Sequence, residues 1–274
     1  MFIGHINDIR ENEYIPLKQF NNRKVIANSN TLDLISNVCP HQKSLLSTEK
    51  GSGARVCPYH GWSFDIKGNP LGSGLTSCKN TNGLKIESVY RWNNLLFTSP
   101  ILVPEADFIN TKHMQLIETR VDHVSATANN IMDLFLDVDH IELIHAGVYD
   151  KLGMPDIREV DWHYYNWGTL QLVPGPNNRY GAAWLAIYPS TMIEWQQGAM
   201  FITIANDLGN GTSDVVVYKY RDIGYTHDLW ETNSLIWETA WRQDKAQAEL
   251  LTEFNMDYLE PAKQHFRNYL VSSV

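Results

Sequence analysis

The chain has 274 residues, of which 43% are hydrophobic and 19% are charged, and it carries a net charge of -9 at pH 7. The composition is that of a globular protein with one or two domains. The negative charge and the lack of a Lys/Arg stripe argue against a nucleic-acid partner, and no apolar stretch approaches the roughly 18 residues that span a bilayer. Three cysteines are too few for a disulfide framework, and the N-terminus lacks the apolar segment of a secretory signal. We therefore expect a cytoplasmic protein with no membrane association.

The first 100 residues are rich in short strand patterns separated by turns. The segment KVIANSNTLDLI at residues 24–35 indicates two strands around a polar turn. The segment WSFDIKGNPL at residues 62–71 indicates a hairpin that turns at KGN. NNLLFTS at residues 93–99 is a further strand pattern. These patterns predict an all-β first part.

The character of the sequence changes after Pro104. Residues 123–146 contain no Pro or Gly and have apolar residues at helical spacing, which predicts a helix that stops at Gly147. Strands of an antiparallel sheet are then predicted at TLQLV, GAAWLAIYP, AMFITIAND and DVVVYKY. Residues 228–258, again without Pro or Gly, predict a long helix. The fold class is therefore α+β, with an all-β domain at residues 1–104 and a helix-sheet-helix domain at residues 105–274.

Two paired clusters of metal-binding residue types stand in the first part. The segment CPHQKSLLSTEKGSGARVCPYHGW holds Cys39 and His41 at one end and Cys57 and His60 at the other. A structural zinc site takes the same donors. Zinc fingers, however, usually pair Cys with Cys and His with His, whereas each cluster here mixes the two. Mixed clusters suit a [2Fe-2S] centre in which two thiolates hold one iron and two imidazoles hold the other.

The segments CPH and CPYHGW closely resemble the ligand loops of Rieske proteins. The resemblance implies that Cys39 and Cys57 hold one iron of the cluster and that His41 and His60 hold the other. The chain departs from the family at Gln42-Lys43, where Arg-Gly is usual, and this departure removes no ligand. Cys78 lies outside both loops, and we interpret it as an ordinary thiol.

A second motif, DVDHIELIH, supplies Asp137, His140 and His145 with the spacing D-x-x-H-x-x-x-x-H. By itself this segment reads as polar residues on a helix. After a Rieske motif, it resembles the iron-binding motif of Rieske non-haem iron oxygenases. Two histidines and one carboxylate on one face of Fe(II) leave positions open for O2 and substrate.

The spacing of the motif predicts a local break in the helix. Five residues of an ideal α-helix turn through about 140°, so His140 and His145 share a face only if the helix loosens or ends between them. Asp137 lies one turn before His140 and can hydrogen-bond its free ring N–H. The resemblance also implies that Asp137 bridges to His60 of a neighbouring subunit on the electron path. The family often has Asn where this chain has Leu134; Asn130 lies one turn earlier.

The resemblance implies that the third iron ligand comes from a later helix, and the segment QDKAQAELL resembles the family's sequence around that ligand. An apolar stripe there has one polar gap, which is filled by Asp244. A carboxylate on such a stripe is costly unless a metal or a cation compensates it, so Asp244 is the preferred ligand. Pairing with an arginine is the alternative, and Asp257 and Asp228 are the fallback ligands.

The resemblance implies the terminal oxygenase component of a Rieske non-haem iron system, an oxidoreductase with a [2Fe-2S] Rieske cluster and a mononuclear Fe(II). Electrons from NAD(P)H would come from a separate reductase, with or without a ferredoxin, because no nucleotide-binding glycine motif is present. O2 would then hydroxylate or oxidatively demethylate a small organic substrate in a homotrimer. The alternatives are a Rieske electron-transfer protein whose C-terminal domain only binds a partner or small molecule, and a zinc-stabilised binding protein. Residues that could line a pocket, or simply fill the core, are Trp162, Trp167, Trp184, Met192, Trp195 and Phe201.

Overall fold

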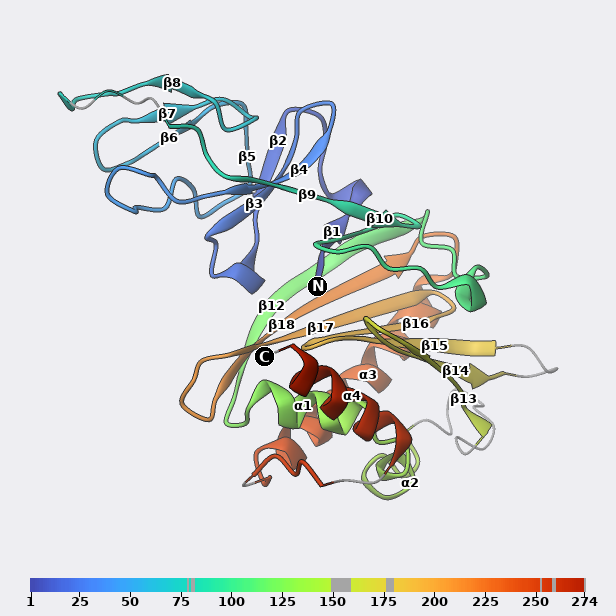
Figure 1. Ribbon diagram of the computed structural model, residues 1–274. Coiled ribbons are helices and arrows are strands. Elements are labelled where there is room, and N and C mark those ends of the chain that lie inside the picture. The colour runs from blue at the N-terminus through green and yellow to red at the C-terminus, as the bar shows by residue number, and fades with distance from the viewer. Residues whose placement is uncertain are drawn as a thin grey trace. The chain divides into compact units, whose positions relative to one another are not determined.

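The chain divides into two units, Phe2–Leu102 and, together with Met1, Val103–Val274. A computed structural model describes residues 1–77, 79, 82–148, 159–175, 180–251, 253–257 and 260–273. Figure 1 shows the first unit as a set of short strands and the second as a broad sheet with helices. The predicted α+β class with an all-β first part is confirmed.

The first unit contains three small antiparallel sheets, ordered β5-β2-β3-β4-β9, β6-β7-β8 and β1-β11-β10. The two predicted strands of residues 24–35 form β3 and β4, and Asn30 provides a left-handed residue between them (φ +76°). The strands of this unit are β1 (Phe2–His5), β2 (Glu13–Pro16), β3 (Lys24–Asn28), β4 (Leu32–Ser36), β5 (Gly51–Ser52), β6 (Arg55–Val56), β7 (Ser63–Phe64), β8 (Pro70–Gly72), β9 (Ile86–Ser88), β10 (Tyr90–Trp92) and β11 (Leu95–Phe97). Two 3-10 turns, η1 (Ile6–Asp8) and η2 (Lys18–Phe20), connect the first strands.

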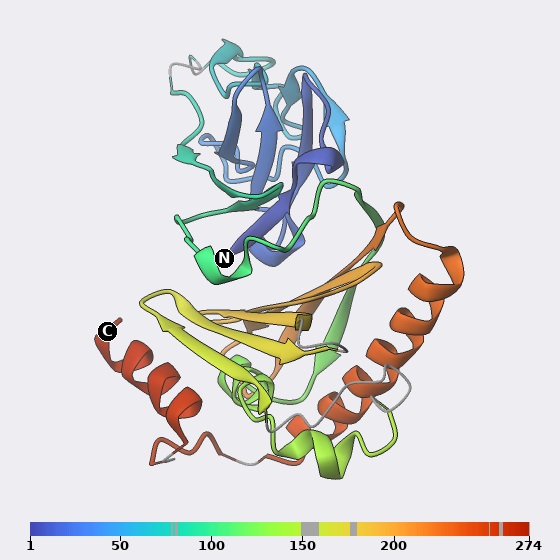
Figure 2. The ribbon, with the colours of Figure 1, turned by 90° about the vertical axis from the view of Figure 1, so that its right-hand side faces the viewer.

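The second unit is built on a seven-stranded antiparallel sheet with the order β12-β18-β17-β16-β15-β14-β13. After the turn η3 (Pro104–Ala106), its strands are β12 (Met114–Val124), β13 (Asp161–Tyr165), β14 (Gly168–Pro174), β15 (Tyr180–Ile187), β16 (Thr191–Gln196), β17 (Ala199–Asp207) and β18 (Ser213–Asp222). Its helices are α1 (Ala128–Phe135), α2 (His140–Ile144), α3 (His227–Ala248) and α4 (Pro261–Ser272). Figure 2 shows α1, α3 and α4 on the same side of this sheet.

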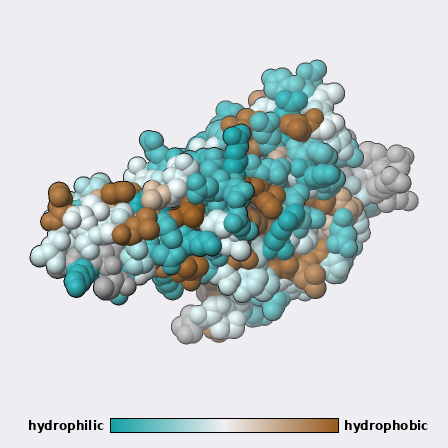
Figure 3. Space-filling view, turned by 90° about the horizontal axis from the view of Figure 1, so that it is seen from above, coloured by the Kyte–Doolittle hydropathy of each residue, from teal (hydrophilic) through white to brown (hydrophobic). Residues whose placement is uncertain are grey.

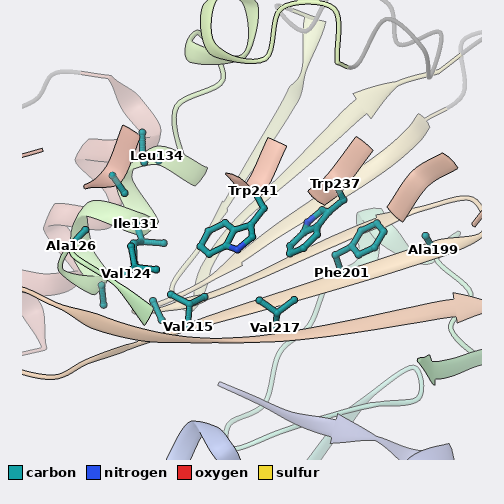
Figure 4. Close-up of a cluster of buried hydrophobic side chains, with 13 residues drawn as sticks. Val124, Ala126, Ile131, Leu134, Ala199, Phe201, Val215, Val217, Trp237 and Trp241 are labelled. Atoms are coloured by element: carbon teal, nitrogen blue, oxygen red, sulfur yellow. The ribbon is translucent and has the colours of Figure 1, made fainter. Parts of the chain in front are cut away.

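Helix and sheet are joined by two apolar clusters. The first packs α1 and α3 against β17 and β18, with Trp237 and Trp241 lying over Phe201, Val215 and Val217 (Figure 4). The second packs α1, α2 and α4 against β14, β15 and β16 and is centred on residues that include Trp184, Met192 and Phe266. A helix whose apolar stripe lies on a sheet gains most of its stability from that burial.

Two of the helix predictions need correction. The helix predicted over residues 123–146 is two short helices, because His123 and Val124 still belong to β12 and the chain leaves helical geometry between Phe135 and His140. Thr127 caps the first of them by accepting a hydrogen bond from the N–H of Asn130. The helix predicted over residues 228–258 is α3, which ends ten residues earlier, at Ala248.

Helix α4 was missed, although its start carries a recognisable signal. Pro261 occupies the first helical position, where the missing N–H costs nothing. None of the described helices combines the length and the apolar character that crossing a bilayer requires. On the face shown in Figure 3, apolar residues lie in small groups between polar ones.

Candidate metal centres

The two loops that carry the Cys and His pairs have the same main-chain design. In the first loop the N–H of Cys39 donates to Ser44 O, and the N–H of Lys43 donates to Cys39 O. In the second the N–H of Cys57 donates to Trp62 O, and the N–H of Gly61 donates to Cys57 O. The residue four positions after each cysteine is left-handed, with φ +59° at Lys43 and +76° at Gly61. The departure from the family at Lys43 therefore places a side chain where glycine is unstrained.

The loops bring the four predicted cluster residues together. Cys39 and Cys57 are both buried in one apolar cluster of the first unit. The rings of His41 and His60 lie 4.9 Å apart between centroids. Burial raises the pKa of the Cys39 thiol, and the main-chain N–H groups of His41 and Gln42 act in the opposite direction. Such N–H groups favour a thiolate, which is the form that binds metal.

One atom of this group lacks a partner that a metal would supply. His60 Nδ1 is buried and has no hydrogen-bond partner among the described residues. A buried ring nitrogen without a partner is costly, and ligation would satisfy it. The donor set of two soft thiolates and two imidazoles fits a Rieske-type [2Fe-2S] cluster.

The second group forms where helix α2 ends. His140 is the first residue of α2, and His145 is the C-cap, with non-helical φ -101° and ψ 24°. The predicted break between the two histidines is confirmed. Because the helix stops at Ile144, both rings point to one place, with centroids 4.9 Å apart.

Asp244 reaches the two histidines from α3, 104 residues later than His140. Its Oδ1 lies 3.2 Å from His140 Nε2 and 2.9 Å from His145 Nε2, and the two Nε2 atoms are 3.1 Å apart. Three donors held at about 2.1 Å from one metal ion and at right angles are about 3 Å apart. The three atoms therefore form a triangle of the size that one metal ion fits.

Hydrogen bonds on the far side of each ring set the histidine tautomers. The Nδ1–H of His145 donates to Gln243 Oε1 at 2.8 Å, and His140 Nδ1 contacts the main-chain carbonyl of Asp137. With a metal ion bound, each Nε2 would present its lone pair to the centre of the site. The hydrogen bond expected from the Asp137 side chain is made by its main chain instead.

The ionisation of Asp244 favours metal binding, whereas a metal ion would compete with a proton at His145. Burial works against a charged Asp244, but hydrogen bonds from His140 and His145 outweigh it and hold the pKa of Asp244 below its ordinary value. Burial also opposes a charged His145, yet hydrogen bonding to Asp244 and then Gln243 raises the pKa of His145. In the absence of metal the two imidazoles thus stabilise the Asp244 carboxylate. A divalent cation would take their place as its counter-charge.

The side chain of Asp137 forms an ion pair with helix α4. Its Oδ2 accepts a hydrogen bond from Lys263 Nζ at 2.7 Å, while its Oδ1 accepts from the main-chain N–H of His140 at 3.2 Å. Lys263 is only 5% exposed. Next to it, Arg267 pairs with Asp133 at 2.8 Å. Two buried cations of α4 therefore pair with Asp133 and Asp137, two of the carboxylates that precede His140.

Other candidates from the sequence lie elsewhere. Asp228 is exposed in the first turn of α3, and Asp257 is exposed in a turn after it, so neither joins the group formed with His140. Asn130 is directed to the end of α3, where its Nδ2 lies 3.5 Å from Leu251 O.

A cavity opens beside His140, His145 and Asp244 and encloses about 450 Å³ not filled by protein atoms, part of it open to solvent. Its walls come from both apolar clusters, with α1, α2 and α3 on one side and β15 and β16 on the other. The remaining lining residues are Phe135, Asp137, Val138, Ile141, Trp184, Met192, Glu194, Trp237, Ala240 and Trp241. Trp184 and Met192 were candidates from the sequence. Glu194, Gln243 and Lys263 were not recognised, although a Glu within the apolar strand pattern TMIEW is itself a signal of a functional carboxylate.

Comparison with known proteins identifies the first part of the chain. Residues 1–81 match the model of the Rieske [2Fe-2S] domain family. A putrescine 2-hydroxylase of Ralstonia nicotianae is 26% identical over 234 residues, which cover 73% of this chain and 63% of that protein. The glycine betaine monooxygenase oxygenase subunit of Chromohalobacter salexigens is 30% identical over 145 residues, which cover 48% of this chain and 33% of that protein. The chain thus matches less than two thirds of the length of these relatives.

Solved structures show the same fold across the chain. The quaternary ammonium Rieske monooxygenase CntA, in complex with an inhibitor, superposes with a TM-score of 0.79 at 16% identity, over 100% of this chain and 87% of that one. Naphthalene 1,2-dioxygenase with bound indole superposes with a TM-score of 0.67 at 15% identity, over 91% of this chain and 73% of that one. Together with the domain match, these findings confirm the predicted resemblance to Rieske oxygenases.

Proposed function

We propose that this chain, whose first 81 residues belong to the Rieske [2Fe-2S] domain family, is the terminal oxygenase component of a Rieske non-haem iron system. The observation that carries the proposal is the triangle formed by His140, His145 and Asp244 beside a cavity. A Rieske electron carrier has no use for a second metal site next to a cavity. The sequence relatives include a hydroxylase and a monooxygenase, and a solved monooxygenase shares the fold.

The proposal assigns one metal centre to each part of the chain. In a Rieske domain at residues 1–104, Cys39 and Cys57 would hold one iron, and His41 and His60 the other. The burial of both cysteines in one cluster and the unpartnered His60 Nδ1 support this assignment. In a catalytic domain at residues 105–274, the three donors of the triangle would hold one Fe(II).

A mononuclear iron held by two histidines and one carboxylate supplies the site at which O2 is reduced in contact with a substrate. The overall reaction is R–H + O2 + 2 electrons + 2 protons → R–OH + H2O, and hydroxylation of an N- or O-methyl group leads to demethylation by loss of formaldehyde. The residues of the chain position this chemistry. Gln243 and the carbonyl of Asp137 fix the two imidazoles, and Trp237 and Trp241 keep one wall of the cavity dry.

Electron supply requires other chains. We propose that a separate NAD(P)H-dependent reductase, with or without a ferredoxin, reduces the cluster. We also propose a cytoplasmic homotrimer in which Asp137 of one subunit bridges to the His60 of its neighbour. In that arrangement Lys263 would remain as the counter-ion of Asp137.

The substrate proposed here is a small organic molecule. The cavity beside the proposed metal ligands is partly open to solvent, so a small substrate would enter it from outside. The names of the sequence relatives include a putrescine hydroxylase and a glycine betaine monooxygenase, so small nitrogen compounds are the first candidates to screen.

Metal analysis tests the proposal directly. Protein reconstituted without air should hold two cluster irons, two labile sulfides and one further iron per chain. Cys57→Ser should remove the visible absorption of the cluster, whereas Cys78→Ser, the matched control, should keep it. His145→Ala should remove only the further iron and leave the cluster spectrum unchanged. Wild-type protein with cluster iron alone would refute the oxygenase and leave an electron carrier.

A further inference from the structure

Glu194 is a carboxylate in the wall of the cavity that the oxygenase chemistry does not use. It lies on β16, where it pairs with Trp184 of β15 and Phe201 of β17. Side chains alternate along a strand, so Glu194 and Met192 face the same side of the sheet. Met192, Trp184 and Glu194 all line the cavity. Glu194 is thus directed from the sheet toward α3.

One oxygen of Glu194 is fixed by the protein, and the other is not. Trp237 Nε1–H donates to Glu194 Oε1 at 2.8 Å. Among the described residues, no hydrogen bond is formed by Oε2. Burial raises the pKa of Glu194 to about 7, and the nearby Asp244 adds to the rise. Burial makes ionisation of Glu194 unfavourable, yet the residue lies in a cavity wall with one oxygen fixed and the other open. This combination indicates a binding role.

The charges around the cavity leave Glu194 as its open anionic acceptor. Five lining residues titrate: Asp137, His140, His145, Glu194 and Asp244. Asp137 is neutralised by Lys263, and Asp244 is held by the two histidines. Among the described residues, neither Lys nor Arg lines the cavity. Apart from the proposed metal ion and its histidine ligands, the described lining residues therefore offer no cation to an anionic substrate.

The rest of the wall is aromatic. Phe135 and Trp241 stack with centroids 6.1 Å apart, and Trp237 and Trp241 stack at 6.2 Å. Trp184 completes the set from the sheet side. Aromatic faces attract cations and also pack against alkyl chains. An aromatic wall with one open carboxylate oxygen matches an alkylamine in its protonated form.

Ligation of the metal is the other role open to a carboxylate in this place. The group whose donor atoms all lie within 4.8 Å of one another contains His140, His145 and Asp244, and does not contain Glu194. Glu194 is therefore set apart from the metal ligands, close enough to Asp244 for their charges to interact.

We propose that Glu194 Oε2 binds the ammonium group of a small protonated alkylamine and holds its carbon chain against Trp237 and Trp241, facing the metal site. The proposal deepens the oxygenase function, because it names the substrate class of the same cavity. The proposed ligand carries an N–H group, because Oε2 can accept a hydrogen bond from it in addition to attracting its positive charge.

Binding to the anaerobic, iron-loaded protein tests the proposal without turnover. Isothermal titration would compare n-alkylammonium ions from ethyl to hexyl with the alcohols of the same length. Wild-type protein should prefer the best alkylammonium over its alcohol by a factor of about ten or more, as expected for a charge-assisted hydrogen bond in a buried site. Replacing its NH3⁺ by N(CH3)3⁺ should weaken binding. Equal affinity for amine and alcohol, or tighter binding of the trimethylammonium form, would overturn the proposal.

Variants assign the effect to Glu194. Glu194→Gln keeps the acceptor for Trp237 and should weaken alkylammonium binding about tenfold or more, while changing alcohol binding little. Glu231→Gln, an exposed carboxylate on α3, is the matched control and should bind like wild type. Unchanged amine affinity in Glu194→Gln would contradict the role given to Glu194. If that variant does not fold, the preference of the wild-type protein for amine over alcohol is by itself the test of the proposal.

The outcome is separable from the oxygenase assignment. Iron content and substrate-independent reduction of the cluster report on the two metal centres, whereas the titrations report on the cavity. If the protein binds amines but lacks the third iron, the oxygenase function is refuted and the amine-binding site is supported. If it holds three irons but shows no preference for amines, the oxygenase function is supported and the amine-binding site is refuted.

Discussion

The stability of the protein should fall with rising pH because of Glu194, and Glu194→Gln should remove that fall. The pKa of Glu194 is raised from 4.5 to about 7, chiefly by burial. A carboxyl group with a raised pKa binds its proton more tightly in the folded state than in the unfolded state, so stability is lost as pH rises from 4.5 toward 7. One pKa unit corresponds to 1.36 kcal/mol, and the full effect is about 3 kcal/mol above pH 7.

Urea unfolding of protein freed of mononuclear iron, followed by tryptophan fluorescence, measures this contribution of Glu194 to the free energy of unfolding. At pH 5 most of the penalty is absent, whereas at pH 8 it is complete. The free energy of unfolding of Glu194→Gln, relative to wild type, should therefore increase by about 2 kcal/mol between pH 5 and pH 8. Glu231→Gln, whose side chain is exposed, should show no such increase. A Glu194→Gln difference that is the same at both pH values would refute the reasoning, because Glu194 would then be as easily ionised in the folded as in the unfolded chain.

Two further variants probe the residues around the metal centres. Asp137→Asn should keep both metals but slow electron transfer to the mononuclear iron, and it should cost about 2 kcal/mol because Lys263 loses its close partner; an unchanged single-turnover rate would remove Asp137 from the electron path. Lys43→Gly should raise the free energy of unfolding by about 0.5–1 kcal/mol, since Lys43 is left-handed and glycine adopts that conformation without strain. Gln42→Gly is the control and should not stabilise, so a stabilisation of equal size there would contradict the argument from φ.

The sequence predicts both metal groups because their residue types and spacings carry chemistry. The end of α2 before His145 follows from the spacing of the two histidines and the expectation that both bind one metal ion. Asp244 follows from a polar position in an apolar stripe, and the structure brings it to the histidines across 104 residues. These residue types and spacings are local features of the sequence, so they can be recognised without knowing how the helices dock.

Features that depend on docking could not be predicted in the same way. Helix α3 ends at Ala248 without Pro or Gly, so no residue in its sequence marked the end. The ion pair between Asp137 and Lys263 joins residues 126 positions apart, and neither residue reveals its partner. Gln243 is one of several polar residues on α3, and only the approach of α2 places it against His145.

Helix α4 supplies the positive charges that balance Asp133 and Asp137. Its two cations follow the carboxylates they pair with by 126 and 134 positions in the chain. Without them, Asp133 and Asp137 would lack their close counter-charges beside His140. The charge balance next to the proposed metal ligands therefore depends on a helix that lies far from them in the sequence.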